Sequence, residues 1–122
     1  LGRKLLTRVK DVMHSPAPAV SPHTSFHDCL MVMTQSRLGM AIVMDQGKLV
    51  GIVTDGDLRR ALLENEGVIR KPVSEFMTAN PHTINDGAQL SEAEIYMQDN
   101  KIRALAVTSD DGEVLGVVEI FD

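Results

Sequence analysis

Apolar side chains in the first half of the chain follow a helical spacing and then two strand-like runs. Four of them lie at i, i+3, i+4 and i+7, the spacing of one helix face: Phe26, Cys29, Leu30 and Met33. The pair Thr24 and Ser25 can cap such a helix, so the pattern predicts a helix near 25–36. Short apolar runs at 40–44 and 49–53 predict two strands joined by a hairpin turn at 45–48.

Two further segments complete this unit. Prolines punctuate a short extended segment around Val20, at Pro16, Pro18 and Pro22. A second helix is predicted from about 56 to 64, because Leu58, Ala61 and Leu62 form an apolar stripe. The expected order is strand, helix, strand, strand, helix.

The second half of the chain repeats the first. The segment 9–13 (Val-Lys-Asp-Val-Met) recurs as 73–77 (Val-Ser-Glu-Phe-Met), and the same spacing relates Asp28 to Glu92 and Met33 to Met97. After one inserted turn residue, the register continues with three pairs: Gly47 with Gly112, Gly51 with Gly116, and Asp57 with Asp122. A register held over this length indicates an internal duplication.

The repeat predicts an α/β protein built of two β-α-β-β-α units. In the second unit we expect a helix near 89–99 and strands near 104–108 and 113–118, and the chain stops where its last helix should begin. We assign 1–8 as a linker, 9–66 as the first repeat and 67–122 as the truncated second repeat. Each repeat would expose an apolar sheet face, so we expect the two to pack about a pseudo-twofold axis. Small ligands bind at such interfaces.

Composition points to a soluble protein with an aliphatic core. The chain has 122 residues, of which 43% are hydrophobic and 3% aromatic, and it has no apolar run of membrane-spanning length and no signal-peptide pattern. One cysteine cannot form an internal disulfide, which favours a reducing, cytoplasmic location.

Charge is divided unevenly between the halves. The net charge of −5 argues against a general nucleic-acid binder. Residues 1–60 carry eight Lys or Arg against five Asp or Glu, whereas 61–122 carry four against twelve. A small anionic ligand is therefore expected in the first half.

The densest candidate site is the segment 51–60, in which a strand runs into a helix through Thr54 and Asp57. Their spacing fits a capping box, a structural device in which each side chain binds the other residue's amide. The same helix terminus could instead bind phosphate, with a hydroxyl donor from Thr54 and with Asp57 accepting from a ribose diol. Both interpretations remain open from the local pattern.

The doubled Asp-Val-Met-like segments and the run Gly51-Ile52-Val53-Thr54-Asp55-Gly56-Asp57 resemble a tandem pair of CBS domains, the Bateman module. Together with 1–6 and 8–14, the segment 54–60 is also similar to the C-terminal half of bacterial arabinose 5-phosphate isomerases. Those enzymes interconvert ribulose 5-phosphate and arabinose 5-phosphate on the way to Kdo, an acidic sugar of lipopolysaccharide and some capsules. The resemblance to a CBS pair covers essentially the whole chain from Val9 onward.

The resemblance implies a ligand cleft for adenosine-type nucleotides. Thr54 and Asp57 would share it with Thr78 and the segment 81–84, which ends at Ile84. Gly39 and Met40 would line the base pocket. Arg59 and Arg60 follow Asp57 in the helix and are the side chains best placed to meet an anionic ligand or a neighbouring subunit, with a solvated surface position as the alternative.

The equivalent cleft of the other repeat is expected to be weaker. Glu119 stands where the pattern has Ser or Thr, and its negative charge would repel phosphate. His14 occupies the position that corresponds to Thr78, and Asp122 remains as a ribose partner. We therefore expect one competent site and a second, weaker one.

The remaining candidates favour structural roles. His23 and His27 have the cap Ser25 between them and do not share a helix face, so no metal site is expected. Cys29 lies on the apolar helix face and fits a small core residue better than a nucleophile. No catalytic residue set is recognised.

These expectations describe a regulatory module without catalytic activity of its own. It would require no cofactor and would bind AMP, ATP or CMP-Kdo, the activated end product. Its partners would be an isomerase domain preceding Leu1 and further copies of itself, with no nucleic acid and no membrane. The alternatives are a ligand-free dimerisation module, or the CBS pair of another enzyme or of a transporter.

Overall fold

The computed structural model describes residues 6–120, which fall into two compact units. We call 18–81 the central unit, and 6–17 together with 82–120 the terminal unit. The division cuts across the sequence repeats, because each unit combines most of one repeat with the first segment of the other.

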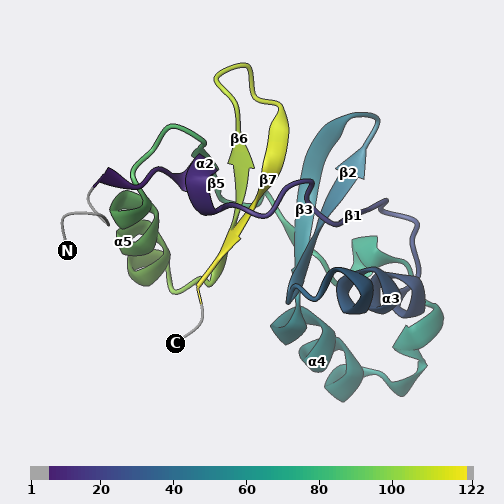
Figure 1. Cartoon of the computed structure of the whole chain (residues 1–122). Helices are drawn as coiled ribbons and strands as arrows, with labels where there is room; N and C mark the ends of the chain where they lie inside the picture. The colour runs from purple at the N-terminus through teal and green to yellow at the C-terminus, as the bar shows by residue number, and fades with distance from the viewer. Residues whose placement is uncertain (1–5, 121–122) are drawn as a thin grey trace. The chain divides into compact units, whose positions relative to one another are not determined.

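The central unit is a four-stranded sheet with two α-helices on one face (Figure 1). Its elements are β1 (Ala19–Val20), α3 (Phe26–Ser36), β2 (Met40–Asp45), β3 (Lys48–Thr54), α4 (Asp55–Glu64), the 3₁₀ helices η1 (Glu66–Arg70) and η2 (Val73–Glu75), and β4 (Thr78–Ala79). The strand order is β1-β2-β3-β4, in which β1 is parallel to β2 and the other pairs are antiparallel. The predicted strands and helices are confirmed within one or two residues, whereas η1, η2 and β4 were not anticipated.

Local signals explain the central elements. Ser25 is the N-cap of α3, and its hydroxyl accepts the amide of Asp28 at 3.1 Å. In the predicted hairpin turn, Gln46 and Gly47 both have positive φ, 51° and 79°. Two central residues of this kind match the twist of the flanking strands. The core lies between α3, α4 and the sheet, and includes Phe26, Cys29, Val43, Val53 and Leu58.

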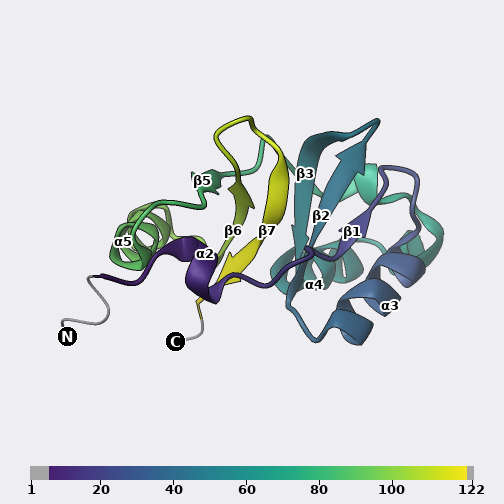
Figure 2. The ribbon, with the colours of Figure 1, turned by 45° about the horizontal axis from the view of Figure 1, so that its top comes forward.

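The terminal unit repeats this plan with fewer elements (Figure 2). Its elements are α2 (Val9–Val12), β5 (Thr83–Asn85), α5 (Leu90–Asn100), β6 (Ala104–Thr108) and β7 (Val114–Glu119). The sheet order is β5-β6-β7, with β5 parallel and β7 antiparallel to β6. Val9 of α2, Ala93 and Met97 of α5, and Leu105 and Val107 of β6 form its core.

The duplication extends to small backbone irregularities. The β2–β3 ladder shifts register between Val43 and Met44, and the β6–β7 ladder shifts between Val107 and Thr108, the equivalent position. Both α3 and α5 end in a left-handed residue, Arg37 and Lys101. The structure therefore confirms two copies of one α/β repeat.

Each sheet is bordered by a segment that belongs, in sequence, to the opposite repeat. β4 pairs with β3 and places Thr78 opposite Ile52. In the terminal unit, His14 forms an antiparallel bridge with Val117, with N···O distances of 2.8 and 3.0 Å. Each of these bordering residues comes directly after a Met of the repeated segment: Thr78 after Met77, and His14 after Met13.

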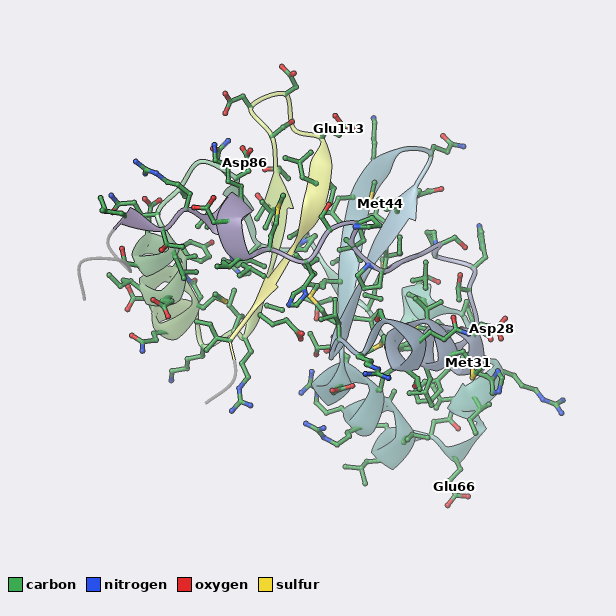
Figure 3. All side chains as sticks on the ribbon, viewed as in Figure 1. Asp28, Met31, Met44, Glu66, Asp86 and Glu113 are labelled. Carbon is green, nitrogen blue, oxygen red and sulfur yellow. The ribbon has the colours of Figure 1, made fainter. Side chains whose placement is uncertain are left out.

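Several large apolar side chains of the central unit are exposed. They lie on α3, α4 and η1 and comprise Leu30, Met31, Leu62, Leu63 and Ile69. Figure 3 shows Met31 on the outer side of α3. Leu63 is 87% exposed, the highest value among these side chains. Among the described helices, none has the length and apolar character needed to cross a membrane.

Candidate functional site

The candidate site is built on the junction between β3 and α4. Thr54 ends β3 and is the N-cap of α4. Its hydroxyl accepts the amide of Asp57 at 3.3 Å, and the Asp57 carboxylate accepts the amide of Thr54 at 2.9 Å. The capping box is therefore present, and each side chain satisfies a backbone donor of the other residue.

Asp57 is the one buried polar or charged residue of the part of the chain described, with 7% of its surface exposed. Its Oδ2 accepts from the amide and, at 3.2 Å, from the hydroxyl of Thr54. Its Oδ1 accepts from the guanidinium of Arg60 at 2.5 Å, one helical turn later. The Thr78 hydroxyl lies 3.3 and 3.4 Å from the two oxygens and donates to this carboxylate. Four donors of the chain thus hydrogen-bond to this buried carboxylate.

Thr78 reaches Asp57 because β4 runs close beside β3. A Cβ on Gly51 would lie 2.6 Å from Sδ of Met77 and 3.1 Å from the carbonyl oxygen of Thr78. Glycine at this position therefore permits the approach of the two segments. The prediction that Thr54, Asp57 and Thr78 lie together agrees with the geometry of the central unit.

Gly39 and Met40 lie beside the same junction. Met40 pairs with Thr54 in the β2–β3 ladder, and the carbonyl of Gly39 accepts the amide of Asp55 at 3.0 Å. Met40 is fully buried. Arg59 is exposed on α4, and Arg60 folds back toward the start of the helix to reach Asp57.

The other residues named in the sequence analysis lie in the terminal unit or outside the described range. Ile84, in β5, is buried in the core of the terminal unit. His14 is exposed and pairs with Val117, whereas Glu119 is the last residue of β7 and is partly buried. Asp122 lies outside the described residues. At the position that corresponds to Thr54, the terminal unit therefore offers a carboxylate.

The histidines and the cysteine have local structural surroundings. Nδ1 of His27 lies 3.1 Å from the carboxylate of Asp28, and both side chains are exposed. Within the described residues, no group of three or more His, Cys, Asp or Glu side chains is placed to hold a metal ion. Cys29 is buried in the central core, and this burial raises the pKa of its thiol from 9.0 to about 11. A neutral thiol is a poor nucleophile at physiological pH.

The main feature that sequence reasoning missed is the pairing of Arg60 with Asp57. The signal was available, because residues three apart on a helix are neighbours and opposite charges at that spacing attract. In the sequence analysis, Arg60 is instead placed against an anionic ligand, a neighbouring subunit or solvent. The junction offers the hydroxyls of Thr54 and Thr78 and one guanidinium, which can donate to an anion, and a buried carboxylate, which can accept from hydroxyl groups.

Comparisons with known proteins agree with this architecture. The CBS domain family model matches residues 9–64 and 73–122. The chain is 48% identical over 120 residues to the probable arabinose 5-phosphate isomerase of Haemophilus influenzae, covering 98% of this chain and 36% of the relative. It is 43% identical over 125 residues to the arabinose 5-phosphate isomerase KdsD of Pseudomonas aeruginosa, covering 100% of this chain and 38% of the relative.

Solved structures give the same result. The CBS domain pair of protein MJ0100, in complex with 5′-methylthioadenosine and S-adenosyl-L-methionine, has a TM-score of 0.84 at 28% identity, covering 93% of this chain and 89% of that chain. CBSX2 in complex with AMP has a TM-score of 0.74 at 27% identity, covering 93% and 90%. The chain spans little more than a third of the length of the isomerase relatives and nearly the whole of these CBS pairs. The chain belongs to the CBS domain family.

Proposed function

We propose that this CBS pair is the regulatory portion of an arabinose 5-phosphate isomerase and that it senses a nucleotide or a nucleotide sugar. The identity to isomerases of two bacteria along almost the whole chain supports this parentage. The sugar-binding and proton-transfer residues would belong to the part of those relatives that this chain does not match. We therefore expect no isomerase activity from the chain alone, and a role in Kdo and lipopolysaccharide synthesis for its parent.

The observation that carries the sensing function is the cluster around Asp57. It gathers two hydroxyls, a guanidinium and a buried carboxylate at the N-terminus of α4. A helix N-terminus attracts phosphate, and a carboxylate accepts from a ribose diol. Adenosine-type ligands are supported by two similar CBS pairs, which were solved in complex with AMP or with 5′-methylthioadenosine and S-adenosyl-L-methionine.

Regulation requires the ligand to favour one arrangement of the chain over another. The path toward the parent enzyme would run through the residues that precede α2. Thr7 accepts the amide of Leu90 at 2.8 Å, and the amide of Val9 binds the carbonyl of Ala88 at 2.8 Å. A change in the terminal unit would therefore reach the segment that we assign as the linker.

CMP-Kdo is a ligand candidate because the activated end product would close a feedback loop. Its carboxylate and phosphate carry the negative charge that Arg59 or Arg60 would accept. AMP and ATP are the other candidates. A thermal-shift panel of AMP, ADP, ATP, CMP and CMP-Kdo tests all of them, since a ligand that binds only the folded state raises the melting temperature.

The panel is repeated on Asp57→Ala, with Ser25→Ala as its control. Both changes weaken a helix cap, but Ser25 caps α3 and makes no contact with the Asp57 cluster in the described structure. We expect a ligand-induced shift in the unchanged chain and in Ser25→Ala, and none in Asp57→Ala. An undiminished shift in Asp57→Ala contradicts a site at Asp57, and the absence of any shift in the unchanged chain contradicts sensing by these ligands.

A second candidate function is dimerisation without a ligand, and the exposed apolar side chains of α3 and α4 favour it. Large apolar side chains exposed on a surface can belong to a protein interface. Sedimentation velocity of the unchanged chain and of Leu63→Ser tests this. We expect a concentration-dependent dimer that Leu63→Ser weakens, whereas a monomer at every concentration contradicts the candidate.

A further inference from the structure

The Asp57 carboxylate is fully engaged by donors of the chain itself. Oδ2 serves the capping box, through the amide and hydroxyl of Thr54. Oδ1 is held by Arg60 at 2.5 Å, and the Thr78 hydroxyl is shared between the two oxygens at longer distances. A ribose diol that binds this carboxylate must therefore displace a donor that is already in place.

Arg60 is the donor that can leave. The Thr54 donors are fixed at the α4 N-terminus, and the β3–β4 pairing holds the backbone of Thr78, whose short side chain stays beside Asp57. Arg60 instead reaches Asp57 from the surface, with 66% of its side chain exposed, and long exposed side chains exchange rotamers readily. Oδ1 is thus occupied by a movable cation that competes with a ligand for the same oxygen.

The position of the Arg60 guanidinium indicates that it requires another anion when its bond to Asp57 is broken. Nη1 of Arg60 lies 3.3 Å from the place that a Cβ on Gly56 would occupy, in the first turn of α4. That end of the helix carries the positive pole of the backbone dipole, so a cation there is unfavourable without a nearby anion. In the present structure the anion is Asp57 itself. A ligand that takes Oδ1 must therefore supply a negative charge of its own.

We propose that Arg60 is a selector at this site: it blocks Asp57 against neutral nucleosides and yields to ligands that bring a phosphate or carboxylate. The inference rests on the proposed nucleotide site and names the chemical class that the site accepts. With an anionic ligand, the guanidinium exchanges the Asp57 carboxylate for the ligand's phosphate and remains paired. With a neutral ligand, the ion pair is lost without replacement.

The test compares AMP with adenosine, which share the base and ribose and differ in the phosphate. Isothermal titration of the unchanged chain should give tighter binding of AMP, by about tenfold or more, because a hydrogen-bonded ion pair contributes about that factor. In Arg60→Ala, AMP should bind about tenfold more weakly, whereas adenosine should bind about threefold more tightly because its competitor is gone. The preference for AMP should therefore disappear.

Two further variants separate this selection from general charge effects and from damage to the fold. Arg70→Ala removes the same charge from an exposed position of η1 in the same unit, outside the Asp57 cluster, and should leave the preference for AMP unchanged. Arg60→Gln keeps most of the side chain's length and replaces Arg60→Ala if that variant folds poorly. It should also lose the preference.

The outcomes distinguish the selector from the site. If AMP binds and its preference over adenosine persists in both Arg60 variants, Arg60 is not the selector, while the nucleotide site stands. Equal losses of preference in Arg70→Ala and Arg60→Ala would mean that only net charge matters, which also overturns the selector. If the unchanged chain binds neither AMP nor adenosine, both the proposed nucleotide site and the selector role of Arg60 are contradicted.

Discussion

The ends of β3 and β7 occupy the same place in the two repeats and carry opposite chemistry. β3 ends in Thr54, whose hydroxyl takes part in a network with Asp57. β7 ends in Glu119, a carboxylate. The segment that borders each strand differs in the same way, with the hydroxyl of Thr78 beside β3 and the imidazole of His14 beside β7.

The backbone, in contrast, is the same at both places. Each strand carries a glycine where the bordering segment approaches, Gly51 in β3 and Gly116 in β7. The duplicated chain has therefore kept the close backbone contact in both units and has kept the hydroxyl, carboxylate and guanidinium set in the central unit. The contact belongs to the fold, and the side-chain set is free to specialise for a ligand.

The largest effect we expect comes from filling these glycines. A Cβ on Gly116 would collide with the backbone carbonyl oxygen of His14, which cannot move without breaking the His14–Val117 bridge. A Cβ on Gly51 would meet chiefly the flexible side chain of Met77. We expect Gly116→Ala to lower the free energy of unfolding by about 3 kcal/mol and Gly51→Ala by about 1 kcal/mol, measured by urea denaturation. Equal losses would contradict a rigid contact at Gly116.

The next effect is on the stability of the α4 cap. Asp57→Ala removes a buried carboxylate together with its bonds to Thr54, Arg60 and Thr78, and should cost about 2 kcal/mol. Ser25→Ala removes a simple cap and should cost about 1 kcal/mol. Urea denaturation at pH 7 measures both. A loss in Asp57→Ala no greater than that in Ser25→Ala would mean that the network beyond the cap adds nothing to stability.

Most of the fold could be predicted because the sequence contains two copies of the same pattern of helices and strands. The helix α3 and strand β2 follow from apolar spacing, and the repeat then assigns α5 and β6 even where their own patterns are weaker. The short elements could not be predicted. The strand β4 has two exposed residues, so no apolar pattern marks it, and it exists because its backbone pairs with β3.

In the candidate site, the bonds between Thr54 and Asp57 could be predicted from the sequence, whereas the bond from Arg60 could not. The spacing of Thr54 and Asp57 predicted the capping box, and the resemblance to CBS pairs added Thr78. The ion pair with Arg60 depends on how one long side chain turns back along its helix, and sequence spacing permits that contact without requiring it. The division into two units also escaped prediction, because it depends on which segments pair across the repeats.

The asymmetry of the strand ends predicts one strong ligand site per chain. Thr54→Val removes the hydroxyl while keeping the side chain's shape, and should weaken AMP binding about tenfold. Glu119→Thr introduces a hydroxyl at the equivalent position and removes a negative charge. The affinity of the second, weaker site for AMP should therefore increase. Isothermal titration gives both affinity and stoichiometry. Two equal sites in the unchanged chain, or no effect of Thr54→Val, would contradict the asymmetry.

The smallest effect comes from a pair of equivalent core positions, Cys29 in α3 and Ala93 in α5. Burial raises the pKa of the Cys29 thiol from 9.0 to about 11, so between these values the unfolded chain ionises its thiol while the folded chain keeps the proton. The unfolded state then binds fewer protons, and the free energy of unfolding falls as the pH rises.

We expect a loss of about 1 kcal/mol between pH 8 and pH 10 from this thiol. Cys29→Ala, which copies the terminal unit's residue, should lose less stability than the unchanged chain over the same range by that amount. Urea denaturation at the two pH values measures the difference, and Ser25→Ala, on the same helix, should retain the full dependence. Identical pH dependence in Cys29→Ala and the unchanged chain would mean that the thiol ionises in the folded core as readily as in the unfolded chain.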